Sequence, residues 1–480
     1  MLDRMHIEEA LETPLPPGVE GVSGVAHDSR SVEPGFAFVA VPGFKRDGAE
    51  FAPQAIENGA SLIIAEREVG GVPSVVVEDA RGALARLAAA FHGHPSGKME
   101  VYGVTGTNGK TTTSYALYSV LASAFGEGSC GLMTTAETVF GGGRRDSVRT
   151  TPEATDIQAM LAAMRDGGVR RVVMEVSSHG VELKRVAGTK FAAALFTNLT
   201  RDHLDLHGSM EEYFAAKREL FLWTDGSKLA NADDEWGRRL AGEVEGVATF
   251  GISADADFRI EGISVSVRGT RFALRHADET LEFETPLLGS YNVSNVAGAA
   301  SLALSVGVEG AEIVRAVSNM PQVPGRFERV GGAADFEVIV DYAHTDVGLA
   351  AVLEVARSVA DVRGGRVICV FGAAGERDGA KRPLMGKVAS EMADESIITT
   401  DDAYGEDPGK IAREVAAGAN GGAMTILDRR EAIRFALGAA RPNDVVVVAG
   451  KGHERIQHLP EGDVPFHDAS VVAELIEEGR

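Results

Sequence analysis

A glycine-rich loop lies between an apolar segment and a helical segment of the chain. The loop spans residues 103–112 and reads Gly-Val-Thr-Gly-Thr-Asn-Gly-Lys-Thr-Thr, with a strand predicted at 100–103 and a helix predicted at 114–124. Glycines let the backbone curl until successive amides point at phosphate oxygens, and a helix N-terminus adds a positive dipole. Lys110 would then reach the outer phosphates of a nucleotide, and the Thr111 hydroxyl would hold Mg²⁺. The order strand, loop, helix predicts an α/β domain that binds a nucleoside triphosphate.

The charge and the cysteine content exclude several classes of protein. A net charge of -23 argues against a nucleic-acid partner, because phosphate backbones need a basic face. Cys130 and Cys369 are the only cysteines, which excludes a disulfide framework and fits a reducing compartment. Residues 1–18 lack the apolar core of a signal peptide, and the apolar runs are too short to span a membrane. We expect a cytoplasmic monomer.

The 480 residues are too many for one core and divide into three blocks. Residues 1–98 mix short apolar runs with helical stretches, as in a small α/β domain. Residues 99–323 begin with the phosphate loop and include an alternating pattern at 258–283, which predicts an antiparallel meander. In residues 324–480 apolar strands alternate with helices, which predicts a doubly wound, mostly parallel sheet. The fold class is therefore α/β, with a central P-loop-type sheet and a Rossmann-like C-terminal sheet.

Polar residues follow two apolar runs of the central block. Glu175 ends one run, and the segment 198–205, Asn-Leu-Thr-Arg-Asp-His-Leu-Asp, follows another. Ligands collect at the carboxyl ends of parallel strands, so the carboxylate and the imidazole are candidates for Mg²⁺. Taken alone, Glu175 could instead form a structural salt bridge, and Lys217 could be a solvated lysine on its predicted helix.

The loop variant Gly-Thr-Asn-Gly-Lys-Thr is typical of the Mur ligases and of the related folylpolyglutamate synthetases. The chain resembles the Mur ligases along almost its whole length, most closely the branch that adds the third residue of the peptide. The resemblance implies that residues 1–98 bind UDP, 99–323 bind ATP and 324–480 bind the amino acid. It implies an ATP-dependent ligase that joins a diamino acid to UDP-N-acetylmuramoyl-L-alanyl-D-glutamate through an acyl phosphate. This reaction belongs to the synthesis of peptidoglycan precursors.

The same resemblance assigns the nucleotide and metal sites. The residues matched to ATP contacts are Gly106, Thr107, Asn108, Gly109, Lys110, Thr111, Thr112, Asn292, Asn295, Arg326 and Asp341. The residues matched to magnesium ligands are Thr111, Glu175, His203 and Lys217, the last carbamylated by CO₂. Carbamylation turns an ammonium into an anion that can bind a metal ion. The catalytic residues implied are Lys110, Lys217, His203 and Arg326. The family's usual Pro-Asp after the Asp341 motif is replaced here by Asp346-Val347.

Contacts with the muramoyl-peptide substrate are matched in the first two blocks. They are Ser29, Thr150, Thr151, Ser177 and Arg185. Arg149 stands where relatives often have asparagine, and Leu183 replaces a commonly polar contact. Without the resemblance, the polar cluster at 28–48 around Ser29 could equally be two turns that flank a strand.

The amino-acid pocket is matched through Arg377, Gly450 and Glu454 and through the loop residues Asp401, Asp402 and Tyr404. Members that add diaminopimelate carry Asp-Asn-Pro-Arg in this loop, and its arginine pairs with the distal carboxylate. Tyr404 cannot form that bidentate pair. The loop also carries Glu406 and Asp407, so its negative charge favours L-lysine over meso-diaminopimelate. The acids could instead simply be solvated.

Two alternatives remain. A ligase for another substrate, such as a folylpolyglutamate synthetase, would keep the phosphate loop but not the polar cluster at 28–48. A non-catalytic subunit of the Mur ligase type would have lost Lys110, Glu175 or Lys217, and all three are present.

Overall fold

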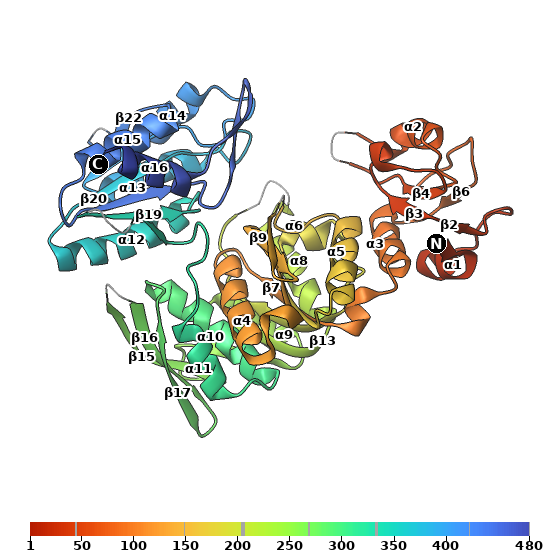
Figure 1. The fold of residues 1–480 in the computed structure, drawn as a ribbon, viewed down its shortest axis with the longest axis horizontal. Helices are drawn as coiled ribbons and strands as arrows, with labels where there is room; N and C mark the ends of the chain where they lie inside the picture. Colours follow the sequence, from red (N-terminus) through yellow and green to blue (C-terminus); the bar gives the residue numbers. More distant parts are fainter. Residues whose placement is uncertain are drawn as a thin grey trace. The chain divides into compact units, whose positions relative to one another are not determined.

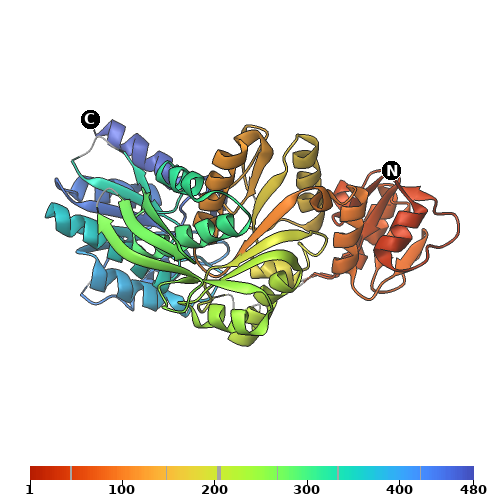
Figure 2. The same ribbon diagram turned by 90° about the horizontal axis from the view of Figure 1, so that it is seen from below.

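The computed structural model describes residues 1–43, 46–147, 149–202, 207–266, 269–331, 335–421 and 423–479. The chain forms two compact units, one of Met1–Phe258 with Gly298–Ile313 and one of Arg259–Ala297 with Val314–Arg480. Both contain sheets covered by helices, which confirms the predicted α/β class (Figures 1 and 2). Within the described ranges, no helix combines the length and the apolar character needed to cross a bilayer. The two predicted boundaries between the three domains stay predictions.

The N-terminal part of the first unit is a small parallel sheet in the order β3-β4-β5-β6. Its strands are β3 (Gly24–Ala26), β4 (Phe36–Val39), β5 (Leu62–Ala65) and β6 (Ser74–Val76), and a short pair, β1 (Leu2–Asp3) and β2 (Gly21–Val22), lies outside it. Its helices are α1 (Arg4–Leu11), α2 (Ala52–Glu57) and α3 (Ala80–Phe91), with 3-10 turns η1 (Ser29–Ser31), η2 (Gly48–Phe51) and η3 (Pro95–Lys98). Strand β5 is buried at every position, as expected of a parallel strand covered on both faces.

The large sheet of the first unit has the order β10-β9-β8-β11-β7-β12-β13-β14. Its strands are β7 (Glu100–Thr105), β8 (Cys130–Met133), β9 (Glu137–Phe140), β10 (Gly143–Asp146), β11 (Arg171–Glu175), β12 (Phe191–Phe196), β13 (Thr224–Asn231) and β14 (Val247–Gly251). Its helices are α4 (Lys110–Phe125), α5 (Ala154–Asp166), α6 (Ser178–Glu182), α8 (Met210–Leu222) and α9 (Glu235–Glu243), with the 3-10 turn η4 (Glu127–Ser129). Strands β11, β7 and β12 are parallel neighbours, so their carboxyl ends meet at one edge.

The second unit contains the predicted meander. Strands β15 (Phe258–Ser266), β16 (Gly269–His276) and β17 (Glu279–Thr285) pair antiparallel in sequence order. The rings of Phe272 and Phe283 stack across β16 and β17 with centroids 5.0 Å apart. Helices α10 (Ser290–Ser305) and α11 (Gly310–Ser318) follow the meander in the chain.

The C-terminal sheet has the order β18-β19-β23-β20-β21-β22, and all its pairs are parallel except β18 with β19. Its strands are β18 (Glu328–Val330), β19 (Glu337–Asp341), β20 (Val367–Phe371), β21 (Glu395–Ile398), β22 (Met424–Thr425) and β23 (Val445–Ala449). Its helices are α12 (Asp346–Arg363), α13 (Lys381–Met392), α14 (Pro408–Ala416), α15 (Arg429–Ala439) and α16 (Asp468–Glu478), and β24 (Ile456–Leu459) and β25 (Gly462–Pro465) form a separate hairpin.

Two apolar cores cover the two faces of this C-terminal sheet. Alternate residues of β23 divide between them: Val445 and Val447 belong to the core with α12, α13 and α14, while Val446 and Val448 belong to the core with α15 and α16. Both faces of the strand are therefore buried, which explains its run of four consecutive valines. This arrangement is the doubly wound sheet predicted from the sequence.

Candidate active site

The glycine-rich loop joins β7 to α4 and requires glycine at two positions. Gly106 has φ +149°, and a Cβ there would lie 1.9 Å from the Thr197 Oγ1. Gly109 has φ +83° and precedes α4 without any side-chain cap. The helix N-terminus therefore carries no capping side chain, as suits a site that receives an anion.

Asn198, which follows β12, holds the loop closed. Its carbonyl oxygen accepts the Thr107 amide at 2.8 Å, and its Oδ1 accepts the Asn108 amide at 2.9 Å. These two amides are therefore bonded within the protein, and the first turn of α4 is the part of the motif best placed to meet phosphate oxygens. The Lys110 Nζ donates to the Thr107 carbonyl at 2.8 Å. Sequence reasoning did not assign a role to Asn198.

Two of the predicted metal ligands lie together at the edge of the sheet. Glu175 is the last residue of β11 and is 1% exposed. Its Oε2 accepts the Thr111 hydroxyl and the Thr135 amide, each at 3.0 Å. Oxygen donors of this kind fit Mg²⁺. His203 lies outside the described residues, and within them no three His, Cys, Asp or Glu side chains form a group that could hold a metal ion.

Lys217 lies on α8 and is 1% exposed. Its Nζ donates to the Gly106 carbonyl at 2.8 Å and lies 4.7 Å from the centre of the Tyr213 ring. Burial, with the positive charge of Lys110, holds the pKa of the Lys217 amine well below its ordinary value. The structure thus places a buried amine, easily made neutral, directly behind the phosphate loop.

Four of the residues predicted to bind the muramoyl-peptide lie close to Glu175. The Thr151 hydroxyl donates to the Glu175 carbonyl at 3.2 Å and accepts the Ser177 amide and hydroxyl, each at 3.0 Å. Arg185 donates to the Thr151 carbonyl at 3.1 Å and pairs with Glu153 at 2.6 Å. Thr150 accepts a hydrogen bond from the Thr135 hydroxyl at 3.0 Å.

Ser29, the fifth predicted contact, lies in η1 of the N-terminal part and is buried. Its hydroxyl donates to Gln54 at 2.7 Å.

Asn292 and Asn295, predicted to contact ATP, lie in the first turns of α10 in the second unit. The Asn292 amide donates to the Leu288 carbonyl at 2.8 Å, and the Asn295 amide donates to the Asn292 Oδ1 at 3.0 Å. The two side chains therefore form one short chain of hydrogen bonds.

Asp341, at the end of β19, accepts the amides of Phe327 at 2.6 Å and Ala343 at 2.8 Å. Burial raises the pKa of the Asp341 carboxyl. The Arg326 guanidinium lies 4.4 Å from the centre of the Tyr342 ring. In place of the family's Pro-Asp, Asp346 begins helix α12, which the Thr345 hydroxyl caps by accepting the Gly348 amide at 3.1 Å.

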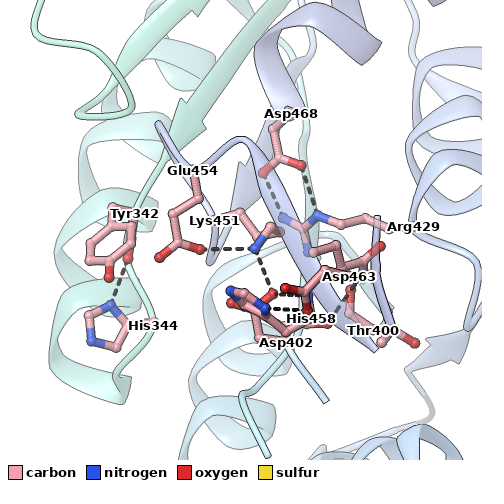
Figure 3. Close-up of polar contacts among 12 residues, drawn as sticks. Tyr342, His344, Thr400, Asp402, Arg429, Lys451, Glu454, His458, Asp463 and Asp468 are labelled. Carbon is pink, nitrogen blue, oxygen red and sulfur yellow. Dashed lines mark hydrogen bonds and ion pairs between the residues drawn. The ribbon is translucent and has the colours of Figure 1, made fainter. Parts of the chain in front are cut away.

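A buried lysine organises the predicted amino-acid pocket (Figure 3). The Lys451 side chain is 0% exposed, and its Nζ contacts Asp402 Oδ1 at 2.7 Å and Glu454 Oε2 at 2.9 Å. Burial alone would lower the pKa of Lys451, but the carboxylates of Asp401, Glu454 and Asp402 raise it. Burial raises the pKa of Glu454. Gly450, with φ +118°, lets the backbone pass Asp401, because a Cβ would lie 2.3 Å from its Oδ2.

Tyr404 has φ +51°, a left-handed conformation that bulky residues rarely adopt. Its amide donates to the His458 carbonyl at 3.0 Å. The Arg377 guanidinium lies 5.5 Å from the centre of the Tyr404 ring. The structure thus brings together Arg377 and Tyr404, which the sequence assigned to the same substrate.

Three matches to one family cover most of the chain. Residues 21–92 match the Mur ligase family catalytic domain, residues 104–303 the Mur ligase middle domain, and residues 325–452 the Mur ligase glutamate ligase domain. A protein of Syntrophomonas wolfei named UDP-N-acetylmuramoyl-L-alanyl-D-glutamate--2,6-diaminopimelate ligase is 41% identical over 95% of this chain and 94% of its own length.

The chain belongs to the Mur ligase family.

A second relative with the same name, from Gloeobacter violaceus, is 42% identical over 100% of this chain and 98% of its own length. A solved structure of a ligase of that name superposes with a TM-score of 0.69 at 30% identity, covering 100% of this chain and 99% of the other. The chain is accordingly an ATP-dependent ligase that forms a carbon–nitrogen bond.

The structure of this Mur ligase weakens the charge argument for lysine. The Asp402 carboxylate is paired with Lys451. Glu406 pairs with the buried Arg382 at 3.0 Å, which lowers the pKa of Glu406 to about 2. Asp407 caps α14 by accepting the amides of Gly409 and Lys410. Three of the four loop acids are therefore engaged within the protein, which makes them less available to a substrate ammonium.

Sequence reasoning also missed a buried ion pair beside the pocket. Arg429 donates to Asp468 at 2.8 and 2.7 Å and to the Ala449 carbonyl at 2.9 Å, and both side chains of the pair are 0% exposed. The pair therefore anchors the end of β23 next to Gly450. Each residue begins a helix, and that position alone carries no signal for a buried pair.

Proposed function

We propose that this Mur ligase adds meso-diaminopimelate to UDP-N-acetylmuramoyl-L-alanyl-D-glutamate, with conversion of ATP to ADP and phosphate. Relatives at 41% and 42% identity carry the name of this reaction. The observation that supports the ligase chemistry is that the loop residues contact both proposed metal-binding side chains: Thr111 donates to Glu175, and the Gly106 carbonyl accepts Lys217.

ATP would bind with its phosphates at the N-terminus of α4 and its outer phosphates near Lys110. Thr111 and Glu175, with His203 and the modified Lys217, are the residues that would hold Mg²⁺, which supplies positive charge to the phosphoryl group and to the substrate carboxylate. Lys110 and Arg326 would stabilise the charge on the transferring phosphoryl group. Asn292, Asn295 and Asp341 are proposed to contact the nucleotide when the domains close.

The surroundings of Lys217 support its proposed carbamylation. The neutral amine attacks the carbon of CO₂, the nitrogen then loses a proton, and a carbamate anion remains. A depressed pKa favours the neutral amine that this step needs. The product anion would be stabilised by Lys110, whose charge already opposes an ammonium at this position. Lys110 therefore destabilises the ammonium form of Lys217 but would stabilise its carbamate.

The peptide substrate would bind along Ser29, Thr150, Thr151, Ser177 and Arg185, with the D-glutamyl carboxylate toward Glu175 and Lys217. Transfer of the γ-phosphoryl group to that carboxylate gives an acyl phosphate. The amine of the incoming amino acid then attacks the acyl carbon, and phosphate leaves. Arg377 would bind the α-carboxylate of the amino acid and Glu454 its ammonium group, so that the attacking nitrogen is held in line.

The test is a turnover assay with UDP-N-acetylmuramoyl-L-alanyl-D-glutamate, ATP and magnesium, with diaminopimelate, lysine, ornithine and alanine supplied separately. We expect ADP and a tripeptide product with diaminopimelate. If none of the amino acids leads to ADP formation, the ligase assignment is contradicted. Product with lysine alone would restore the preference for lysine drawn from the loop. A cytoplasmic location and a monomeric state stay predictions.

A further inference from the structure

The hairpin of β24 and β25 is attached to the loop that carries Tyr404. The rings of Tyr404 and His458 stack with centroids 5.1 Å apart and planes 13° from parallel. The His458 amide also donates to Asp402 Oδ1 at 3.0 Å. The side chain of Gln457 donates to the carbonyls of Thr400 and Asp401 at 3.1 and 3.2 Å. His458 is therefore fixed to the amino-acid pocket through both its ring and its backbone.

One nitrogen of the His458 ring is engaged within the hairpin. Its Nδ1 lies 2.7 Å from the Asp463 Oδ1 (Figure 3). A carboxylate accepts hydrogen bonds, so Nδ1 carries the proton in this contact and Nε2 is the nitrogen left for a ligand. The side chain is 34% exposed, which leaves it within reach of a small molecule. In the protonated ring, Nε2 donates a hydrogen bond and the ring carries a positive charge.

The other cations beside the pocket differ in how accessible they are. Lys451 and Arg429 are 0% exposed and are held by carboxylates of the protein. Arg377 is exposed and lies against Tyr404, as His458 does. Diaminopimelate has a carboxylate at each end, so its recognition calls for two accessible, positively charged side chains. Arg377 supplies one such charge, and His458 supplies the second when a proton on Nε2 makes its ring a cation; both groups lie on the same tyrosine.

We propose that His458 is a specificity-determining residue that donates from Nε2 to the second carboxylate of the diamino acid. Tyr404 fixes the plane of the ring by stacking, and Asp463 fixes the proton on Nδ1. The strained backbone of Tyr404 is the local cost of presenting its ring to His458. This inference rests on the proposed function, since it names how that pocket distinguishes diaminopimelate from lysine.

The experiment measures kcat/KM for diaminopimelate and for lysine with the wild type and with His458→Gln. Loss of a hydrogen bond between charged groups should lower the ratio of the two kcat/KM values about 10- to 100-fold, through the diaminopimelate value. Lysine lacks the second carboxylate, so its value should stay within about 2-fold and also reports that the variant is folded. His458→Arg, which restores a cation, should recover most of the ratio.

His467→Gln is the matched control. His467 is also a partly exposed histidine with Nδ1 in a hydrogen bond, here to Ser470 at 2.8 Å, and it lies at the start of α16. The control should leave the ratio unchanged. An unchanged ratio in His458→Gln, or an equal fall for both amino acids, overturns the proposal. A wild type active with lysine but not with diaminopimelate also overturns it and leaves the ligase activity standing, whereas no activity with either amino acid contradicts the proposed function itself.

Discussion

Replacing Lys451 by methionine should destabilise the C-terminal part of this ligase by about 3–5 kcal/mol, the usual cost of removing one partner of a buried ion pair. The Lys451 side chain is 0% exposed, and its ammonium contacts two carboxylates at 2.7 and 2.9 Å. Methionine fills a similar volume but leaves Asp402 and Glu454 close together without a cation. For a domain of this size, that loss lowers Tm by roughly 6–20 °C.

The pH dependence follows from the two pKa shifts. The pKa of Lys451 is raised in the folded protein, so its stabilisation is complete below its ordinary pKa of 10.5 and is lost as the pH rises through the raised value. The pKa of Glu454 is also raised, so the stability due to its protonation is present below 4.5 and is lost as the pH rises through its folded value. Without Lys451 that folded value rises further. The deficit of Lys451→Met should therefore shrink as the pH falls through the folded pKa of Glu454.

The assay is thermal unfolding followed by calorimetry across this pH range, for Lys451→Met and for Lys451→Met with Glu454→Gln. The second substitution removes one uncompensated charge and should recover part of the lost Tm. Lys410→Met is the matched control, because Lys410 is 57% exposed and pairs with Glu406 and Glu414 only at 3.7 Å. Such exposed pairs contribute about 0–1 kcal/mol. A loss in Lys451→Met no larger than in this control, or a deficit that grows as the pH falls, would refute the reasoning.

Two further predictions concern the phosphate loop. Protein equilibrated with ¹³C-bicarbonate should show a carbamate carbon signal by NMR. Lys217→Met should lose this signal, and its kcat should fall by a factor on the order of 10²–10³. Lys190→Met, which changes an exposed lysine, should keep both the signal and kcat, and an unchanged signal in Lys217→Met would contradict the carbamate. Gly106→Ala should abolish nucleotide binding, measured by titration calorimetry with ATP, because its Cβ would lie 1.9 Å from Thr197 Oγ1. Gly126→Ala is the control, since Gly126 has φ +87° but open space around it, so the change adds backbone strain alone. Equal ATP affinity in the two variants would show that the close approach at Gly106 does not matter.

The sequence predicted the elements whose pattern is local. The strand before the loop and the helix after it, β7 and α4, follow from apolar runs and glycine spacing, although the helix begins at Lys110 rather than at residue 114. The alternating meander and the parallel strands of the C-terminal sheet were predicted by the same kind of pattern. Strands β9 and β10 were not predicted, because they are short and β10 is exposed along its whole length.

In the candidate site too, some features could be predicted from the sequence and others depend on the tertiary structure. Residues of the loop motif, with Glu175 and Lys217, could be selected from sequence because their family pattern is specific, but their roles in binding remain predictions. The four acids of the loop at residues 401–407 cannot be told apart by their sequence pattern. Only the fold shows that Glu406 is paired with Arg382 and Asp402 with Lys451, each from a distant segment.

The sequence by itself determined that this chain has a glycine-rich loop at the end of a parallel strand, because backbone conformation there depends on the glycines within it. The tertiary structure decided which charged groups are buried and with which partners. Whether a carboxylate or an ammonium is solvated, paired or neutral depends on side chains brought to it from other elements. Lys217, which its helix alone would leave in solvent, becomes a buried amine only because α8 packs behind Gly106.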